Sequence, residues 1–250
     1  MTSLGISVED RDGVRHVVLD RPDKKNALTT AMYAALAEAI ASAGQDDVGA
    51  LLLSARGETF TAGNDLRDFL EQPPRGDDAP VFRFLNGLVA TDVPLIAAVR
   101  GAAIGIGTTM LLHCDLVYAA PGATFKLPFV DLGLVPEAGS SVLLARRIGR
   151  ARAGAALFLG ETIGAQQAYD DGLVTTLVDD VLLDETAASA ARAIAAKPRQ
   201  AVRETKRLLN WDRETILAAI ARETVAFGER LASDEARAVM SAFFQRGPRP

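Results

Sequence analysis

The chain has 250 residues, of which 49% are apolar, and such a chain can bury a sizeable core without disulfides, metals or an obligatory partner. This composition, with 24% charged residues, excludes a disordered tail protein. The 27 basic and 32 acidic residues give a formal net charge of −5, which does not favour nucleic acid or an anionic membrane surface as a partner, so an anionic ligand would need a local group of cations.

A single cysteine, Cys114, permits no internal disulfide and has only His113 beside it as a second metal-binding side chain. This pattern favours a reducing cytosol, and we expect a cytoplasmic protein without a metal site. Residues 1–10 lack the basic and then apolar run of a signal peptide. The longest uncharged stretch, residues 101–114, is shorter than the about 20 residues that span a bilayer, so no membrane segment is predicted.

Strands alternate with helices in the first part of the chain. Residues 14–19 (VRHVVL) are mostly β-branched and aliphatic and precede a turn signal at 20–23, which predicts a strand and then a loop. Thr29 is a suitable N-cap for an amphipathic helix over residues 31–43. Residues 72–80 hold prolines and charges without periodic apolar positions, which predicts a mobile surface loop. Short apolar runs predict further strands at 49–54, 94–99, 115–119 and 175–178.

The pattern becomes helical from Val181 onward. Amphipathic segments at 199–210, 212–231 and 234–245 predict a carboxyl-terminal region made of helices. We therefore expect an α/β core over residues 1–195, built from repeated β-α units, and a helical region over residues 196–250. This helical region is too thin to bury its own apolar face, so it is expected to dock on the core or on another subunit.

Two glycine-containing turns are candidates for binding an anion. Residues 62–64 (AGN) lie directly before a short helical pattern that starts near Asp65, and residues 101–107 (GAAIGIG) lead from a predicted strand into a helix. Backbone N–H groups at a helix start are free donors, and two such sites could converge on one oxygen. Neither segment matches a dinucleotide or P-loop motif. On pattern alone, such turns are most often only tight connections, and Asp65 is interpreted as a capping or turn carboxylate.

Glu137 is the candidate general base. It follows a proline, between apolar residues and the predicted start of an amphipathic helix, so burial could raise its pKa. From spacing alone, the simpler interpretation is an acid in a first helical turn that complements the helix dipole. His16 and His113 are interpreted as core or edge residues, because no serine, histidine and aspartate pattern accompanies them.

Five segments together resemble the crotonase, or enoyl-CoA hydratase/isomerase, superfamily, and they cover nearly the whole chain. They lie at residues 19–28, 60–66, 94–107, 114–141 and 233–248. The resemblance implies a ββα spiral core with a carboxyl-terminal helical trimerisation region, assembled as a homotrimer or a dimer of trimers. It implies an acyl-CoA thioester as substrate, with coenzyme A as part of that substrate and no further cofactor.

The resemblance also assigns roles to residues. It places the two backbone N–H groups that stabilise the thioester enolate at Asn64 and Ile106, where any residue except proline supplies the donor. The positions that usually flank the adenine of CoA fall on Ala62 and Leu66, and the loop near the CoA phosphates falls on Lys24 and Lys25. These two lysines are the local cations that the acidic chain requires.

The sequence departs from the hydratase pattern at both catalytic glutamates. Thr109 and Phe129 occupy those two positions, so the usual acid and base for water addition are missing. Glu137 stands where the peroxisomal type of Δ3,Δ2-enoyl-CoA isomerase carries its single base, and Phe129 would help to exclude water. We therefore predict an isomerase that moves a double bond from C3 to C2. The alternatives are a hydratase with an atypical acid and base, and a non-catalytic acyl-CoA binding protein.

Overall fold

The computed structural model describes residues 2–246 except for residues 4, 46, 73, 75 and 77. Within this part of the chain, a seven-stranded sheet has the order β1-β2-β3-β4-β5-β7-β10 and a three-stranded sheet has the order β6-β8-β9. The strands are β1 (Thr2–Ser3), β2 (Ile6–Arg11), β3 (Val14–Leu19), β4 (Ala50–Ala55), β5 (Leu95–Val99), β6 (Ala102–Ile104), β7 (Leu116–Ala119), β8 (Thr124–Lys126), β9 (Ile163–Gly164) and β10 (Thr176–Leu177).

The large sheet is antiparallel at its amino-terminal edge and parallel elsewhere. Strands β1, β2 and β3 pair antiparallel in sequence order, whereas β3, β4, β5, β7 and β10 run parallel. The five strands predicted from apolar runs are confirmed to within one residue at each end. Strand β2 was not predicted, because its carboxyl-terminal half is charged and exposed and lacks an apolar run.

The α-helices of the described residues are α1 (Thr30–Ala43), α2 (Leu66–Glu71), α3 (Pro80–Ala90), α4 (Ile106–Thr109), α5 (Ser140–Ile148), α6 (Arg150–Phe158), α7 (Ala165–Asp170), α8 (Leu183–Ala195), α9 (Arg199–Leu209), α10 (Arg213–Leu231) and α11 (Asp234–Arg246). Short 3₁₀ helices are η1 (Pro22–Lys24), η2 (Met110–His113), η3 (Val130–Leu132) and η4 (Asp180–Leu182). Thr29 is confirmed as the N-cap of α1, since its side chain accepts the Met32 N–H. None of the described helices combines the length and the apolar character that crossing a membrane requires.

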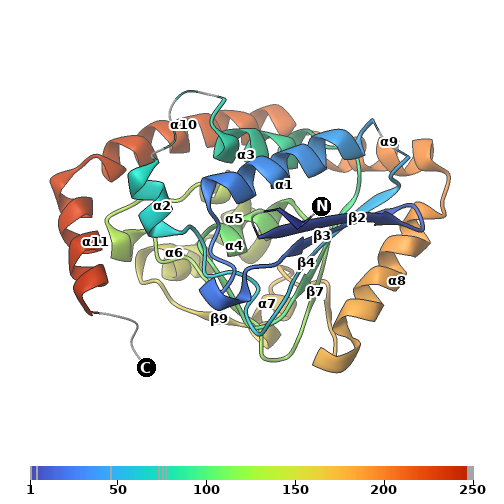
Figure 1. The fold of residues 1–250 in the computed structure, drawn as a ribbon, viewed down its shortest axis with the longest axis horizontal. Helices are drawn as coiled ribbons and strands as arrows, with labels where there is room; N and C mark the ends of the chain where they lie inside the picture. Colours follow the sequence, from blue (N-terminus) through green and yellow to red (C-terminus); the bar gives the residue numbers. More distant parts are fainter. Residues whose placement is uncertain are drawn as a thin grey trace.

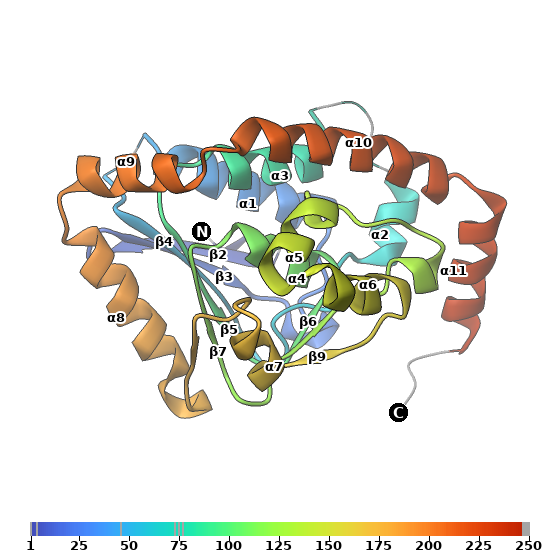
Figure 2. The same cartoon turned by 180° about the vertical axis from the view of Figure 1, so that it is seen from behind.

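Helices cover both faces of the large sheet (Figures 1 and 2). Along β4, Leu51 and Leu53 join the main core with α1 and α3, whereas Leu52 points to the other face and packs with Leu183 and Ala187 of α8. A strand that is buried on both faces needs apolar residues at every position, which explains the uninterrupted apolar run in β4. Three residues of the predicted loop at 72–80 lie outside the described part of the chain.

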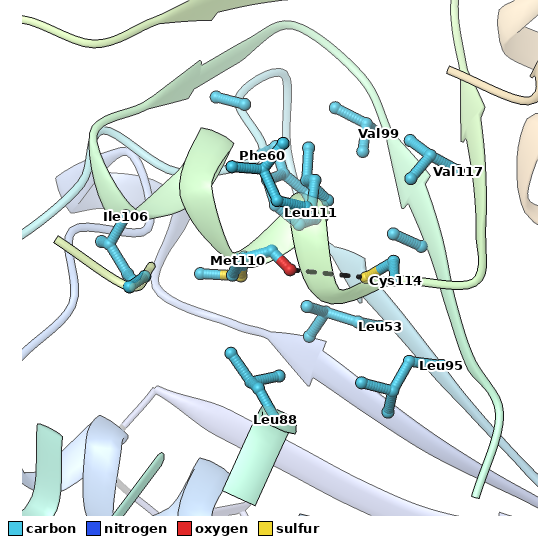
Figure 3. Packing of buried hydrophobic residues seen from close by; sticks show 14 of the residues in the cluster. Leu53, Phe60, Leu88, Leu95, Val99, Ile106, Met110, Leu111, Cys114 and Val117 are labelled. Carbon is cyan, nitrogen blue, oxygen red and sulfur yellow. Dashed lines mark hydrogen bonds between the residues drawn. The ribbon is translucent and has the colours of Figure 1, made fainter. Parts of the chain in front are cut away.

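The short helix α4 and the turn η2 lie inside the main core. The side chains of Ile106, Met110 and Leu111 are buried in the main core, and Leu111 lies beside Phe60 (Figure 3). The Cys114 thiol donates to the Met110 carbonyl at 3.8 Å. Packing on all sides therefore holds the segment after the glycine-rich turn in one position.

The carboxyl-terminal helices dock on the core of their own chain. Figures 1 and 2 show α10 lying across α3, and α10 also contacts α5 while α11 contacts η3. Ile216 and Ile220 of α10 belong to the main core. The first of the two expected docking modes is therefore observed, whereas the boundary between residues 195 and 196 stays a prediction. Residues 247–250, at the end of the predicted helical region, lie outside the described residues.

Candidate active site

The two glycine-containing turns meet through their backbones. Thr61 N–H donates to the Ala102 carbonyl, and Ile104 N–H donates to the Thr61 carbonyl, both at 3.0 Å. Gly63 has a φ of +89°, and a Cβ atom built on it would lie 2.9 Å from the Ile104 carbonyl oxygen. A side chain at position 63 is therefore excluded both by backbone conformation and by space. The structure brings together the two segments that the sequence predicts as neighbours.

The Asn64 and Ile106 N–H groups are available as donors. In the described part of the chain, neither group donates a hydrogen bond to another protein atom. Asn64 is nevertheless held in place, because the Leu28 N–H binds the Gly63 carbonyl and the Asp65 N–H binds the Leu28 carbonyl, both at 2.8 Å. Ile106 is the first residue of α4, where N–H groups have no partner within the helix.

A cavity of about 770 Å³ opens beside these turns. Its lining includes six residues to which the resemblance assigns a role in binding the substrate or stabilising the enolate: Lys24, Ala62, Asn64, Leu66, Ile106 and Phe129. The lining also holds the cations Arg21, Arg67 and Lys126, which sequence reasoning missed because they are scattered along the chain. The local group of positive charge that an anionic ligand needs is thus present, and it is larger than the predicted pair of lysines.

Lys25 and Glu137 are not among the residues that line this cavity. The Lys25 side chain is exposed, and its residue has a φ of +50°. Its carbonyl accepts the Ala62 N–H at 2.9 Å, so its observed contact with the site is made by the backbone. Next to it, the buried Asn26 side chain donates to the carbonyls of Arg56 and Thr59 at 2.9 and 2.8 Å and thereby fixes this loop.

Asp65 is a capping carboxylate, as predicted. One oxygen accepts the Asp68 N–H at the start of α2, and the other accepts from Arg21 Nη1 at 2.8 Å. Burial disfavours the charged form, but these hydrogen bonds outweigh it, and the pKa of Asp65 lies below its usual value. The carboxylate therefore stays charged and holds Arg21, which lines the cavity.

Glu137 is buried and is not part of a helix. Helix α5 begins at Ser140, so the expectation that Glu137 occupies a first helical turn was wrong. Ala138 and Gly139, with φ values of +61° and +73°, turn the chain between Glu137 and the helix. The carboxylate thus lies outside the region where it would complement the helix dipole directly.

The surroundings of Glu137 raise its proton affinity. Burial raises the pKa of this carboxyl group to about 8; a hydrogen bond from Thr109 lowers it, and the charge of Glu223 raises it further. The Thr109 hydroxyl donates to Glu137 Oε1 at 2.5 Å, and Thr109 itself is fully buried. A carboxyl group with such a pKa can accept and release a proton near neutral pH.

Tyr33 connects helix α1 to Asn64. The Tyr33 hydroxyl donates to Asn64 Oδ1. Burial raises the pKa of Tyr33 well above its usual value, and the charge of Glu137 adds to this effect. Glu137 lies beside α4, because it accepts from Thr109 of the helix that begins at Ile106. Sequence reasoning missed Tyr33, because it reads as one more apolar position of α1.

The two histidines are confirmed as core or edge residues. His16 lies in β3 and its Nε2 accepts from Arg11 Nε at 3.1 Å. His113 Nε2 lies 2.7 Å from the Ala138 carbonyl, which can only accept, so this nitrogen donates. Burial lowers the pKa of His113 to about 4, and the imidazole is neutral near pH 7.

Comparisons with known proteins agree with this fold. The family model for enoyl-CoA hydratase/isomerase matches residues 9–249. The chain therefore belongs to the enoyl-CoA hydratase/isomerase family, and the crotonase fold expected from the resemblance is confirmed. The crystal structure of an enoyl-CoA hydratase/isomerase from Pseudoalteromonas atlantica T6c is 39% identical, with a TM-score of 0.94 over 99% of both chains.

Curated relatives carry different activities. Enoyl-CoA delta isomerase 2 of Homo sapiens is 34% identical over 247 residues, which is 96% of this chain. This chain spans only 63% of the length of that human relative. A 2,3-dehydroadipyl-CoA hydratase of Escherichia coli strain K12 is 33% identical over 98% of this chain and 97% of its own. Membership of the family is therefore shown, and it leaves open both isomerisation and hydration.

Proposed function

We propose that this protein is an enoyl-CoA isomerase that moves a double bond from C3 to C2 of an acyl-CoA thioester. The observation that carries the proposal is the buried carboxylate of Glu137, with its pKa raised to about 8. Thr109 and Phe129 stand where the resemblance places the two hydratase glutamates. Shifting a double bond needs one group that removes and returns a proton, whereas adding water needs an acid and a base that act on water.

In the proposed mechanism, the thioester oxygen accepts hydrogen bonds from the Asn64 and Ile106 N–H groups. Glu137 takes the proton from C2, and the electron pair of that C–H bond delocalises into a dienolate whose negative charge lies largely on the thioester oxygen. Glu137 then returns its proton to C4, and the double bond forms between C2 and C3. Each such N–H typically stabilises the transition state by about 3 kcal/mol.

Apolar residues favour proton return over hydration. Phe129 and Leu134 line the cavity and are buried. They would keep water away from the dienolate and support the raised pKa of Glu137. We further propose that Arg21, Lys24 and Lys126 hold the phosphates of CoA, and that no cofactor beyond the substrate's own CoA takes part.

A paired assay tests the proposal. Purified protein is given a 3-enoyl-CoA and, separately, crotonyl-CoA, and the absorbance of the conjugated enoyl thioester is followed. Gain of absorbance with the first and no loss with the second is the expected result. The hydratase among the relatives makes hydration the second candidate, and loss of crotonyl-CoA absorbance would replace the isomerase proposal with it. Binding of acyl-CoA without any turnover would instead identify a non-catalytic binding protein.

A substitution assigns the base. Glu137→Gln is expected to lose at least about a thousandfold in kcat while it still binds a saturated acyl-CoA. The matched control is Glu161→Gln, which removes an exposed carboxylate outside the site and should keep wild-type rates. Full turnover by Glu137→Gln would refute the assignment.

The remaining expectations are also proposals. We propose assembly as a homotrimer or a dimer of trimers, which light scattering on the purified protein would test. A cytoplasmic location and the lack of a nucleic-acid partner rest on the composition alone.

A further inference from the structure

Helix α10 places one carboxylate in an otherwise apolar stripe. Ile216, Ile220, Glu223 and Phe227 are spaced by three or four residues, so they lie on one face of the helix. The two isoleucines are part of the main core, and Phe227 lines the cavity. Glu223 is only 8% exposed. A buried carboxylate at a position suited to leucine costs free energy unless hydrogen bonds compensate it.

Both oxygens of Glu223 bind the turn that carries Glu137. Oε2 accepts the Gly139 N–H at 2.6 Å, and Oε1 accepts the Ser141 N–H at 3.0 Å. Charge-assisted hydrogen bonds of this kind are stronger than those between neutral groups. One side chain of α10 thus holds the backbone on both sides of Ser140.

The turn needs such support. Ala138 has a φ of +61°, a conformation that costs a residue with a side chain of order 1–3 kcal/mol. A Cβ atom on Gly139 would come within 3.0 Å of Ile216 Cγ2, so the glycine allows α10 to approach closely. His113 donates to the Ala138 carbonyl, and the Ser140 hydroxyl donates to the Glu137 carbonyl at 2.6 Å.

We propose that Glu223 is a positioning residue that holds Glu137 at the reacting carbons by fixing the turn at residues 137–141. This inference rests on the proposed function, because it takes Glu137 as the base. Helix α10 would then contribute directly to the site, because it supplies Phe227 to the cavity wall and Glu223 to the turn that carries Glu137. Thr109 fixes the carboxylate of Glu137, and Glu223 fixes the backbone from which it extends.

Two effects follow if Glu223 is replaced by glutamine. The amide can accept only one of the two N–H groups, so the turn relaxes, and a displacement of about 1 Å at a reacting group can reduce the rate about a hundredfold. The negative charge of Glu223 also raises the pKa of Glu137, so its removal lowers that pKa. Arg222 is the charged group that lowers the pKa of Glu223. The remaining influence on the pKa of Glu137 is the hydrogen bond from Thr109, which lowers it.

The test compares Glu223→Gln with Glu223→Asp and with Glu229→Gln, an exposed carboxylate of the same helix. For Glu223→Gln, kcat should fall ten- to a hundredfold, while KM and the Kd for a saturated acyl-CoA change less than about threefold and the Glu137 pKa falls. Glu223→Asp keeps the charge but cannot reach both N–H groups, so kcat falls while the Glu137 pKa stays raised. Glu229→Gln should match the wild type.

The pKa of Glu137 is measured without turnover by carbon NMR of protein labelled at the glutamate carboxyl carbon, with the Glu137 signal identified by its absence in Glu137→Gln. If the wild type does not isomerise a 3-enoyl-CoA, the proposed function fails, and this titration still tests the contact. Wild-type kcat and an unchanged Glu137 titration in folded Glu223→Gln would overturn the inference. An equal loss of kcat in Glu229→Gln would also overturn the inference. If Glu223→Gln does not fold, the Glu223→Asp variant provides the test. Wild-type kcat in Glu223→Asp would then overturn the inference.

Discussion

Replacing Thr109 by valine tests the electrostatics of the proposed base. Valine keeps the shape of threonine but removes the hydroxyl that donates to Glu137 Oε1 at 2.5 Å. A hydrogen bond to a charged group contributes about 1.5–3 kcal/mol, which corresponds to about one to two pKa units. Since this bond favours the carboxylate, its loss should move the pKa of Glu137 upward from about 8 to roughly 9–10.

The assay is the pH dependence of kcat/KM for isomerisation of a 3-enoyl-CoA. Below the pKa, the carboxylate fraction falls about tenfold per unit of upward shift, so Thr109→Val should lose about tenfold or more at pH 7.5. At high pH the rate should recover, because a more basic carboxylate is an equally good or better base. Thr109→Ser keeps the hydroxyl and serves as the control with an unshifted profile. A wild-type profile for Thr109→Val would refute this reasoning, as would a loss that is the same at every pH.

Three further predictions concern stability and the oxyanion site. Because the pKa of Glu137 rises from about 4.5 to about 8 on folding, its burial costs little below pH 4.5, costs more as the pH rises from 4.5 to 8, and costs no more above pH 8. Glu137→Gln should therefore be more stable than the wild type at pH 8 by on the order of 4 kcal/mol, with a much smaller difference at pH 5, as measured by urea unfolding. Gly63→Ala should abolish turnover and lower the melting temperature, because its Cβ meets the Ile104 carbonyl; normal kinetics would contradict the close approach of the two turns. Lys206→Met removes a buried ammonium group that donates to Val93 O and Asp115 Oδ2, and the free energy of unfolding should fall by about 1.5–3 kcal/mol with unchanged kcat; unchanged urea unfolding would contradict this assignment.

Much of the candidate site was predictable from local sequence. Gly63 and the glycines of residues 101–107 mark sharp turns, and the resemblance placed Asn64 and Ile106 there before the structure showed their N–H groups without protein partners. These features depend on backbone conformation within a few residues, which glycine and helix starts encode locally.

Other features of the site could not be predicted. Arg21 and Lys126 lie far apart in the chain and meet at one cavity only in the folded state. Tyr33 and Glu223 read as ordinary members of helices, and nothing in their neighbouring residues marks the hydrogen bonds to Asn64 and to Gly139. The strands β6, β8 and β9 are too short to produce a pattern.

The sequence by itself determined five strands of the large sheet, the carboxyl-terminal helices, the positions of the glycine turns and the resemblance to the family. All of these follow from local apolar periodicity and from motifs of a few residues. Only the tertiary structure decided the state of Glu137, because its burial, the Thr109 hydroxyl and the Glu223 charge come from three separate segments. A pKa depends on the three-dimensional surroundings of a group, and spacing along the chain does not report them.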